Sequence, residues 1–153
     1  MTLLLGTLAG CGFHLQGALQ VPEAMQRTYI QTTDRHSPFY RELRASLQAN
    51  DVQLVDTASE ATATLSVLLD DTGQRVLSVS ARNVPTEYEV YYTVRYTLED
   101  SETNLMDPAT LTLTRDYTYD STLVLGKARE EELLRDAIAR DLVRIVMKQL
   151  ATL

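Results

Sequence analysis

The sequence predicts an α+β fold: a two-layer sandwich in which a mainly antiparallel four-stranded sheet carries two helices packed on one face. Two observations support this prediction. The middle of the chain alternates apolar and polar side chains with the period of a strand, whereas apolar residues near its end recur every four positions, as on one face of a helix. The chain has 153 residues, 44% of them apolar and 23% charged, which fits one compact domain.

The first third of the chain predicts a strand, a helix and a second short strand. Residues 27–33 contain Tyr29, Ile30 and three threonines, a composition that favours a strand. Ser37 and Pro38 are typical of a helix N-cap and first helical residue, and the helix is expected to end at Asn50. Its apolar positions have four-residue spacing: Phe39, Leu43 and Leu47. Residues 52–55 are consistent with a short strand.

The middle of the chain predicts long strands. Residues 61–69 carry apolar side chains at every odd position. Two interpretations of residues 71–73, Asp-Thr-Gly, stay open: a hairpin turn, or a bulge in one long bent strand that resumes through residues 75–81. Residues 86–99 alternate most clearly, with one face formed by Tyr88, Val90, Tyr92, Val94, Tyr96 and Leu98. After a loop containing Asn104 and Pro108, residues 109–119 place leucines and tyrosines on one side and threonines on the other.

The end of the chain predicts a long helix from about Lys127 to the C-terminus. Its apolar stripe consists of Leu134, Ile138, Leu142, Val146 and Leu150. Glutamates 130–132 lie near its start, and Arg144 and Lys148 lie near its end. This distribution of charge complements the helix dipole.

The N-terminal residues predict a lipid anchor. Residues 1–10 are the expected remnant of a signal peptide, and Leu8-Ala9-Gly10-Cys11 matches the lipobox after which bacteria acylate a cysteine. Residues 11–153 then form the single mature domain, and several acyl chains on Cys11 give stable membrane attachment. Gly12, in place of the aspartate that retains lipoproteins in the inner membrane, favours the outer membrane. No basic residue follows Met1 directly, although signal peptides usually begin with one. The sequence is therefore expected to start a few residues late or to be truncated at its N-terminus.

An alternative interpretation makes residues 2–10 a buried strand and Cys11 a core thiol. The order Gly10-Cys11-Gly12 argues against it, because glycine weakens a strand end. Residues 12–26 show no periodicity and are expected to form an extended tether.

Composition excludes several classes of function. One cysteine excludes a disulfide framework and a multi-cysteine zinc site. A net charge of −7 without a basic run argues against nucleic-acid binding, and no stretch of about 18 apolar residues could span a bilayer. His14 and His36 lack an acid or nucleophile at motif spacing, and Glu87 and Glu89 lie on an alternating strand. We therefore expect neither an enzyme nor a metal or cofactor.

The polar side chains of the predicted sheet leave two interpretations open. Threonine, glutamate and arginine are normal on a sheet face that contacts water. The same hydrogen-bonding groups also suit contact with another polar wall, since Thr110, Thr112, Thr114 and Asp116 occupy four consecutive alternate positions. The second interpretation predicts a protein partner.

Taken together, four short motifs resemble the lipopolysaccharide-assembly lipoprotein family, LptE, along essentially the whole chain. These motifs are Cys11-Gly12-Phe13-His14-Leu15 after the lipobox, Thr86-Glu87-Tyr88-Glu89-Val90, Arg115-Asp116-Tyr117-Thr118-Tyr119, and Leu123-Val124-Leu125-Gly126-Lys127 followed by Glu130-Glu131. The resemblance implies a protein anchored to the periplasmic side of the outer membrane, which forms a heterodimer with the LptD β-barrel, sits inside it and assists its assembly. It also implies binding of lipopolysaccharide for delivery to the outer leaflet.

The resemblance implies that Arg82 and Lys127 bind the phosphates of lipopolysaccharide. Two cations on neighbouring loops can attract an anion even in an acidic protein. The simpler interpretation is a solvated loop cation at Arg82 and a charge flanking an acidic helix start at Lys127. Two other functions compete with the family assignment: another outer-membrane lipoprotein scaffold, such as a pilotin or a barrel-assembly accessory subunit, and a periplasmic enzyme with a deep pocket.

Overall fold

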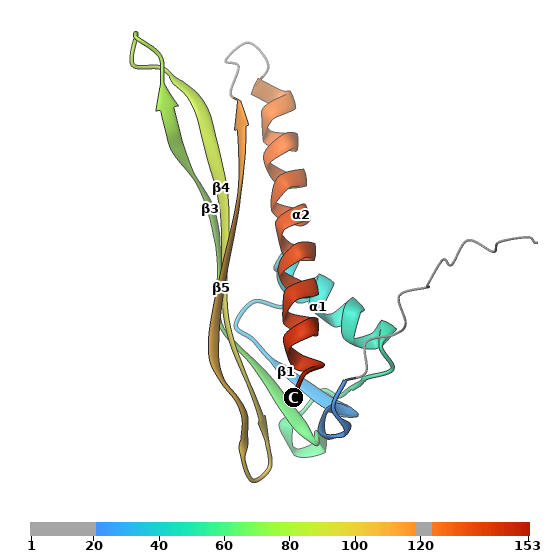
Figure 1. Cartoon of the computed structure of the whole chain (residues 1–153). Helices are drawn as coiled ribbons and strands as arrows, with labels where there is room; N and C mark the ends of the chain where they lie inside the picture. Colours follow the sequence, from blue (N-terminus) through green and yellow to red (C-terminus); the bar gives the residue numbers. More distant parts are fainter. Residues whose placement is uncertain (1–20, 119–123) are drawn as a thin grey trace, which may run out of the picture.

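The structure, a computed structural model, describes residues 21–118 and 124–153, without the side chains of residues 124–127 (Figure 1). Long strands and one long helix give the described part an elongated shape. The elements in chain order are η1 (Glu23–Met25), β1 (Arg27–Gln31), α1 (Pro38–Ala49), β2 (Gln53–Leu54), η2 (Ala58–Glu60), β3 (Ala63–Val79), β4 (Pro85–Asp100), β5 (Asn104–Thr118) and α2 (Val124–Leu150). The α+β class is confirmed.

Helix α1 begins where the sequence predicts. The Ser37 Oγ accepts a hydrogen bond of 3.0 Å from the Tyr40 backbone N–H, and Pro38 occupies the first helical position, where its missing N–H costs nothing. The buried residues of the helix are the three with four-residue spacing, Phe39, Leu43 and Leu47. The helix ends before Asn50, and Asp51 then adopts a φ of 62° as the chain turns into β2.

The sheet is mixed and has five strands in the order β2-β1-β3-β4-β5, so the predicted number of four strands is wrong, whereas the long strands β3, β4 and β5 pair antiparallel. Strand β1 pairs in parallel with both β2 and β3, because the connections through α1 and η2 return the chain in the same direction. Strand β2 has two residues but belongs to the sheet, since the Val55 N–H donates to the Thr28 carbonyl at 3.1 Å. The two-layer packing stays a prediction.

Strand β3 is one continuous strand of 17 residues, so the interpretation of residues 71–73 as a hairpin turn is wrong. All three residues pair with β4, Gly73 with Tyr91. The irregularities lie elsewhere, between Val67 and Leu69 and at two consecutive steps from Val76 to Val79. Each extra residue changes which side chains lie on which face of the sheet.

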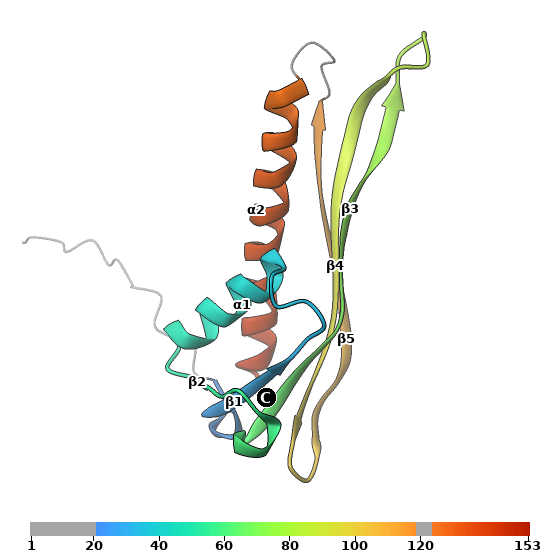
Figure 2. The ribbon, with the colours of Figure 1, turned by 180° about the vertical axis from the view of Figure 1, so that it is seen from behind.

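Strands β3, β4 and β5 form a long antiparallel meander that extends well beyond β1 and β2 (Figures 1 and 2). Pro108 lies within β5 rather than in a loop. A proline is tolerated there because β5 is an edge strand, whose outward N–H groups need no partner in the sheet. The turn between β4 and β5 is instead residues 101–103, where the Asp100 carboxylate accepts from the Thr103 backbone N–H at 2.6 Å.

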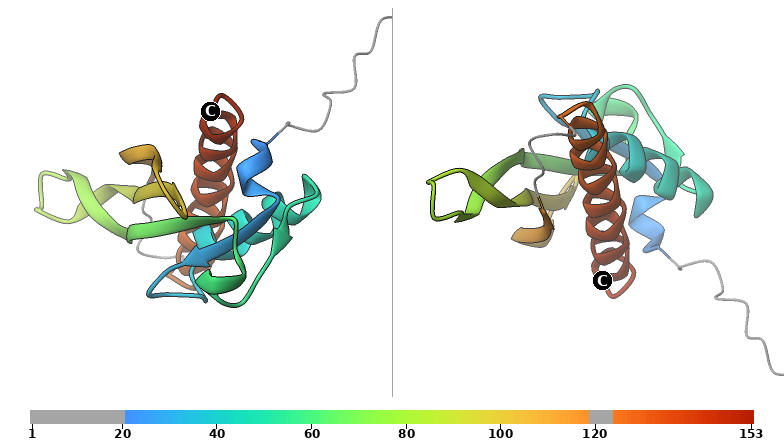
Figure 3. Two further views of the ribbon diagram at one scale, coloured as in Figure 1. Left: turned by 90° about the horizontal axis from the view of Figure 1, so that it is seen from below. Right: turned by 90° about the horizontal axis from the view of Figure 1, so that it is seen from above.

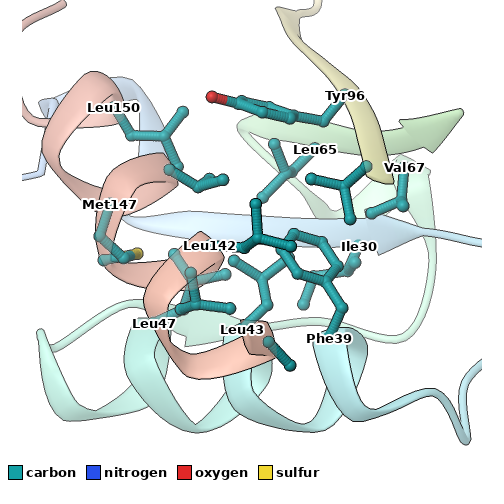
Figure 4. Close-up of a cluster of buried hydrophobic side chains, with 14 of the residues drawn as sticks. Ile30, Phe39, Leu43, Leu47, Leu65, Val67, Tyr96, Leu142, Met147 and Leu150 are labelled. Carbon is teal, nitrogen blue, oxygen red and sulfur yellow. The ribbon is translucent and has the colours of Figure 1, made fainter. Parts of the chain in front are cut away.

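The core lies where α1, α2 and the first half of the sheet meet (Figure 4). Helix α2 lies against β4 and β5, and α1 packs on α2 and beside β2. Side chains from all three parts fill the space between them: Ile30, Phe39, Leu43, Leu47, Leu65, Val67, Tyr96, Leu142, Met147 and Leu150. The predicted apolar faces of both helices and of residues 86–99 are therefore the ones that the fold buries.

Two leucines of α2 provide a test of this core. Leu142 is fully buried, whereas the side chain of Leu133 is 52% exposed. We expect Leu142→Ala to lower the free energy of unfolding by about 2–5 kcal/mol, because it leaves a cavity, and Leu133→Ala to change it by about 0.5 kcal/mol or less. Chemical denaturation of the two variants checks this, and equal losses would mean that the helix faces are assigned incorrectly.

Candidate functional site

Arg82 lies in the tight turn that joins β3 and β4. The Ser80 N–H donates to the Val84 carbonyl and the Asn83 N–H donates to the Ser80 carbonyl, both at 2.8 Å. Asn83 adopts a φ of 61°, a left-handed conformation that asparagine tolerates better than most residues. The turn thus fixes the backbone around Arg82, whose side chain is exposed and has no ion pair among the described residues.

Lys127 lies in the first turn of α2, and its side chain is outside the described part of the chain. Two of the glutamates that follow it form ion pairs with arginines. The Arg129 Nη1 lies 2.5 Å from Glu132 Oε2, and Arg135 pairs with Glu131 one turn further along. These ion pairs reduce the negative potential that an anion near the helix start would meet.

The β3–β4 turn and the start of α2 lie at the same end of the molecule, opposite the end that holds the C-terminus (Figures 1 and 2). Seen along the long axis, the turn projects away from α2 rather than folding over it (Figure 3). Arg82 and the backbone of Lys127 therefore occupy one end of the fold, where the turn and the helix start point apart.

A second group of cations lies between β5 and α2, around a groove of about 440 Å³. Asp141 holds two of them, with Oδ2 at 2.5 Å from Arg115 Nη2 and Oδ1 at 3.0 Å from Arg144 Nη1. Lys148 also lines the groove. The single carboxylate of Asp141 pairs with both arginines. The net positive charge of the groove is therefore smaller than the charge of its cations alone.

One face of the meander is covered by α2 and the other is not covered by any described helix (Figures 1 and 2). We call the uncovered side the open face. The strand registers assign to it residues that pair across the three strands: Leu69, Asp71, Gly73, Arg75, Glu89, Tyr91, Thr93, Arg95, Thr110, Thr112, Thr114 and Asp116.

The open face is polar and its side chains bond to each other. The Thr93 and Thr112 hydroxyls are 2.9 Å apart, and Arg75 forms an ion pair with Glu89. The predicted alternation of threonines against leucines in residues 109–119 is confirmed over the described part of that segment, since Leu111 and Leu113 pack against the core. This face therefore carries mainly hydroxyl and charged groups.

A polar cluster connects α1 to the two central strands. Asp70 accepts two hydrogen bonds, at 2.5 Å from the Ser37 hydroxyl and at 2.7 Å from the Tyr92 hydroxyl. The Tyr92 oxygen in turn accepts from the Phe39 backbone N–H at 3.2 Å. The N-terminus of α1 is thereby fixed to β3 and β4 by side-chain bonds in addition to apolar packing.

Burial is the main cause that raises the pKa of the Tyr92 hydroxyl above its usual range, and the hydrogen bond to Asp70 raises it further. Burial also raises the pKa of Tyr96 to about 12. The Tyr96 hydroxyl donates to Gln149 in the last turns of α2. Both tyrosines therefore hold their protons in the folded state at pH values where an unfolded chain ionises.

The cluster around Asp70 was missed by the sequence analysis, which assigned Leu69 to the apolar side of its strand. The extra residue at Leu68 reverses the alternation, so Leu69 lies on the open face, 44% exposed, and Asp70 lies on the α2 side. The one available signal was an aspartate directly after an apolar run, next in the sequence to a second aspartate. It could not distinguish a bulge from a turn.

The remaining predicted residues are exposed or lie outside the described residues. Cys11 and His14 precede residue 21, so the lipid anchor and the core-thiol alternative stay untested predictions. His36 is exposed, and its backbone N–H donates to Asp34 at 2.7 Å. In the described part of the chain, no group of three metal-ligating side chains comes together, and no helix is long and apolar enough to cross a membrane.

Comparison with known proteins places this arrangement among bacterial lipoproteins. The family model described as LptE, lipopolysaccharide-assembly, matches residues 25–150. The proteins named LPS-assembly lipoprotein LptE from Yersinia pestis and Yersinia pseudotuberculosis are 28% identical to this chain over 157 residues, which covers 99% of this chain and 75% of each relative.

Solved structures of lipoproteins have the same fold. An uncharacterized lipoprotein B from Nitrosomonas europaea has a TM-score of 0.74 at 26% identity, covering 92% of this chain and 91% of that one. A minor lipoprotein from Acinetobacter baumannii has a TM-score of 0.70 at 25% identity, covering 86% of this chain and 94% of that one.

Removing the Tyr92 hydroxyl tests the buried polar cluster. We expect Tyr92→Phe to lower the free energy of unfolding at pH 7 by about 1–3 kcal/mol, because Asp70 and the Phe39 N–H each lose a partner. The raised pKa adds a second effect. The stability due to the protonated hydroxyl is complete below about pH 10, the unfolded value, and is lost as the pH rises towards the folded value.

Denaturation at pH 7 and at several pH values above 10 measures both effects. The variant should lose less stability than the unmodified chain over the alkaline range. An unchanged stability at pH 7, or an identical alkaline loss in both proteins, would contradict the assigned role of Tyr92.

Proposed function

Because this chain belongs to the LptE family of lipopolysaccharide-assembly proteins, we propose that it is an outer-membrane lipoprotein that plugs the LptD β-barrel. In this role it assists assembly of the barrel and binds lipopolysaccharide for delivery to the outer leaflet. The role requires binding surfaces rather than catalysis, and the relatives that it resembles are named for assembly.

The open face is the observation that carries the plug proposal. The lumen of a large β-barrel is polar, so a protein inside it needs hydrogen-bonding groups on its surface. The open face supplies threonine hydroxyls and charges of both signs along two neighbouring strands, β4 and β5. An apolar sheet face could not satisfy the polar groups of such a wall, because each buried unpaired group costs free energy.

The N-terminal anchor fits the same arrangement. Cys11 and Val21 are ten residues apart. An extended chain of that length spans at most about 35 Å, at roughly 3.3–3.6 Å per residue. Acyl chains on Cys11 would therefore hold the domain close to the periplasmic leaflet of the outer membrane, within reach of a barrel embedded in that membrane.

Arg82 and Lys127 supply the proposed contacts to lipopolysaccharide. A guanidinium binds phosphate through two parallel hydrogen bonds, and an ammonium binds it as a point charge. Both residues belong to the end of the molecule formed by the β3–β4 turn and the start of α2. A cation so close to a helix N-terminus is unfavourable by itself, which supports a role in binding an anion.

Isolation of the complex from the native membrane tests the plug proposal. After extraction in a mild detergent, we expect one β-barrel partner, LptD, to copurify in equal amount. Thr112→Glu with Thr114→Glu should lower its yield, because two carboxylates are added to the open face. The control, Thr57→Glu with Ser59→Glu, adds the same charge at exposed positions outside that face and should leave the yield unchanged.

Recovery of the chain without a barrel would overturn the plug proposal. Recovery with a different membrane partner would favour the pilotin or accessory-subunit function. A barrel yield that falls equally in both double variants would mean that net charge, rather than the open face, decides the association.

Charge reversal tests the lipopolysaccharide site. We expect Arg82→Glu with Lys127→Glu to weaken binding of purified lipopolysaccharide at least about tenfold, since a hydrogen bond to a charged group contributes roughly 1.5–3 kcal/mol. The matched control is Arg44→Glu with Lys148→Glu, which changes the net charge equally at exposed positions elsewhere. Binding titrations of both variants, with thermal unfolding as a check of folding, distinguish the outcomes.

The barrel complex should persist in the Arg82 and Lys127 variant, because these residues are assigned to the glycolipid and not to the barrel. Unchanged lipopolysaccharide binding, or an equal loss in the control, would remove Arg82 and Lys127 from the site.

A further inference from the structure

Most of strand β3 forms a free edge of the sheet. Strand β1 pairs only with Ala63–Ser66, and beyond these residues β3 has β4 on one side and no described strand on the other. The free segment runs from Val67 to Val79. Its outward backbone N–H and C=O groups are available to another strand.

Exposed apolar side chains concentrate along this edge. Six of the eight large apolar residues that are exposed in the described part of the chain lie on β3 or in the turn after it: Leu68, Leu69, Val76, Leu77, Val79 and Val84. Their exposed fractions lie between 44% and 52%. A long free edge with apolar side chains is the type of surface that other strands bind.

The edge is complementary to itself. If two copies of β3 align antiparallel with Gly73 opposite Gly73, then Asp71 of each copy lies opposite Arg75 of the other. In the same register Thr72 lies opposite Gln74 and Asp70 lies opposite Val76, and Leu69 comes beside Leu77 at the ends of the regular segment. Opposite charges stabilise an antiparallel pairing, whereas like charges at these positions would weaken it.

The local geometry suits this register. Residues 69–76 pair with β4 without a register shift, and the irregularities at Leu68 and Leu77 limit this regular segment at both ends. Arg75 already pairs with Glu89 of β4, and the five N–H donors of its guanidinium leave some for a second carboxylate. Gly73 at the centre is covered by the Tyr91 ring, whose hydroxyl lies 2.7 Å from the position that a Cβ would take.

We propose that outside the barrel two copies of this chain pair through β3, antiparallel and centred on Gly73, to form one continuous sheet. The self-complementary charges argue for a second copy as the occupant. A closed barrel offers no free strand edge of its own, so the inference concerns the chain outside any barrel and does not depend on the proposed plug function.

Disulfide cross-linking tests the register. In the full-length chain with Cys11→Ser, we expect a mixture of Asp71→Cys and Arg75→Cys proteins to form a disulfide-linked dimer. Opposed residues of antiparallel strands have Cα atoms about 4.5–5.5 Å apart, within the range for a disulfide. Either variant alone should cross-link far less, because its two thiols are four residues out of register, roughly 13 Å apart.

Charge reversal tests the pairing energy. By analytical ultracentrifugation, we expect Asp71→Arg or Arg75→Asp to raise the dimer dissociation constant about tenfold, because two opposite-charge pairs become like-charge pairs. The combined variant, Asp71→Arg with Arg75→Asp, should restore it to within about threefold of the unmodified chain. Thermal unfolding controls for the loss of the Arg75–Glu89 ion pair.

The two experiments can each overturn the proposal. A chain that sediments as a monomer at every concentration up to about millimolar, where dimers with a free energy of roughly −4 kcal/mol would form, excludes the pairing. Equal cross-linking of the mixture and of the single variants, or no rescue by the combined charge exchange, shows that any association uses a different register or surface.

Discussion

The irregularity at Leu68 is the constraint on which the arrangement of the long strands depends. Before it, odd-numbered side chains such as Leu65 and Val67 enter the core, and after it even-numbered side chains lie on the α2 side. The change turns Asp70 towards Ser37 and Tyr92, where it holds the start of α1. It also leaves Asp71 and Arg75 on the open face. One extra residue in β3 thus decides both how the start of α1 is held and which side chains the open face carries.

Much of the fold could be predicted from side-chain periodicity, because burial dictates that pattern directly. The apolar residues of both helices and of residues 86–99 are buried where expected, and Ser37 and Pro38 begin α1. The order of the strands and their directions could not be predicted. A short strand was expected at residues 52–55, where β2 lies, but its place beside β1 rests on backbone hydrogen bonds, which carry no residue-type signal. Pro108 suggested a loop, because a proline inside a strand is tolerated only at special places such as a sheet edge. That β5 is an edge strand follows from the order of the strands, which the sequence does not give.

The candidate site was predictable in part. The sequence motifs indicated the LptE family, and the family model that matches residues 25–150 agrees with them. Arg82 and Lys127 were selected by resemblance, and their proposed role is what the charge-reversal variants test. The polar cluster of Asp70 could not be predicted from the sequence. The hydroxyls of Ser37 and Tyr92, 33 and 22 residues away, reach Asp70 only because the register of β3 shifts at Leu68. Side chains whose partners are distant in sequence leave no periodic signal.

The position of Met147 and Leu150 in the core has a consequence for the folding process. The meander β3–β4–β5 is built from neighbours in sequence and can form early, whereas the apolar face of α1 stays unprotected until the last turns of α2 arrive. A chain made from its N-terminus therefore leaves Phe39, Leu43 and Leu47 without their contacts to α2 until synthesis of the C-terminal helix is nearly complete. Transiently exposed apolar surface of this kind promotes aggregation, so the last helix to be made is the one that protects the first.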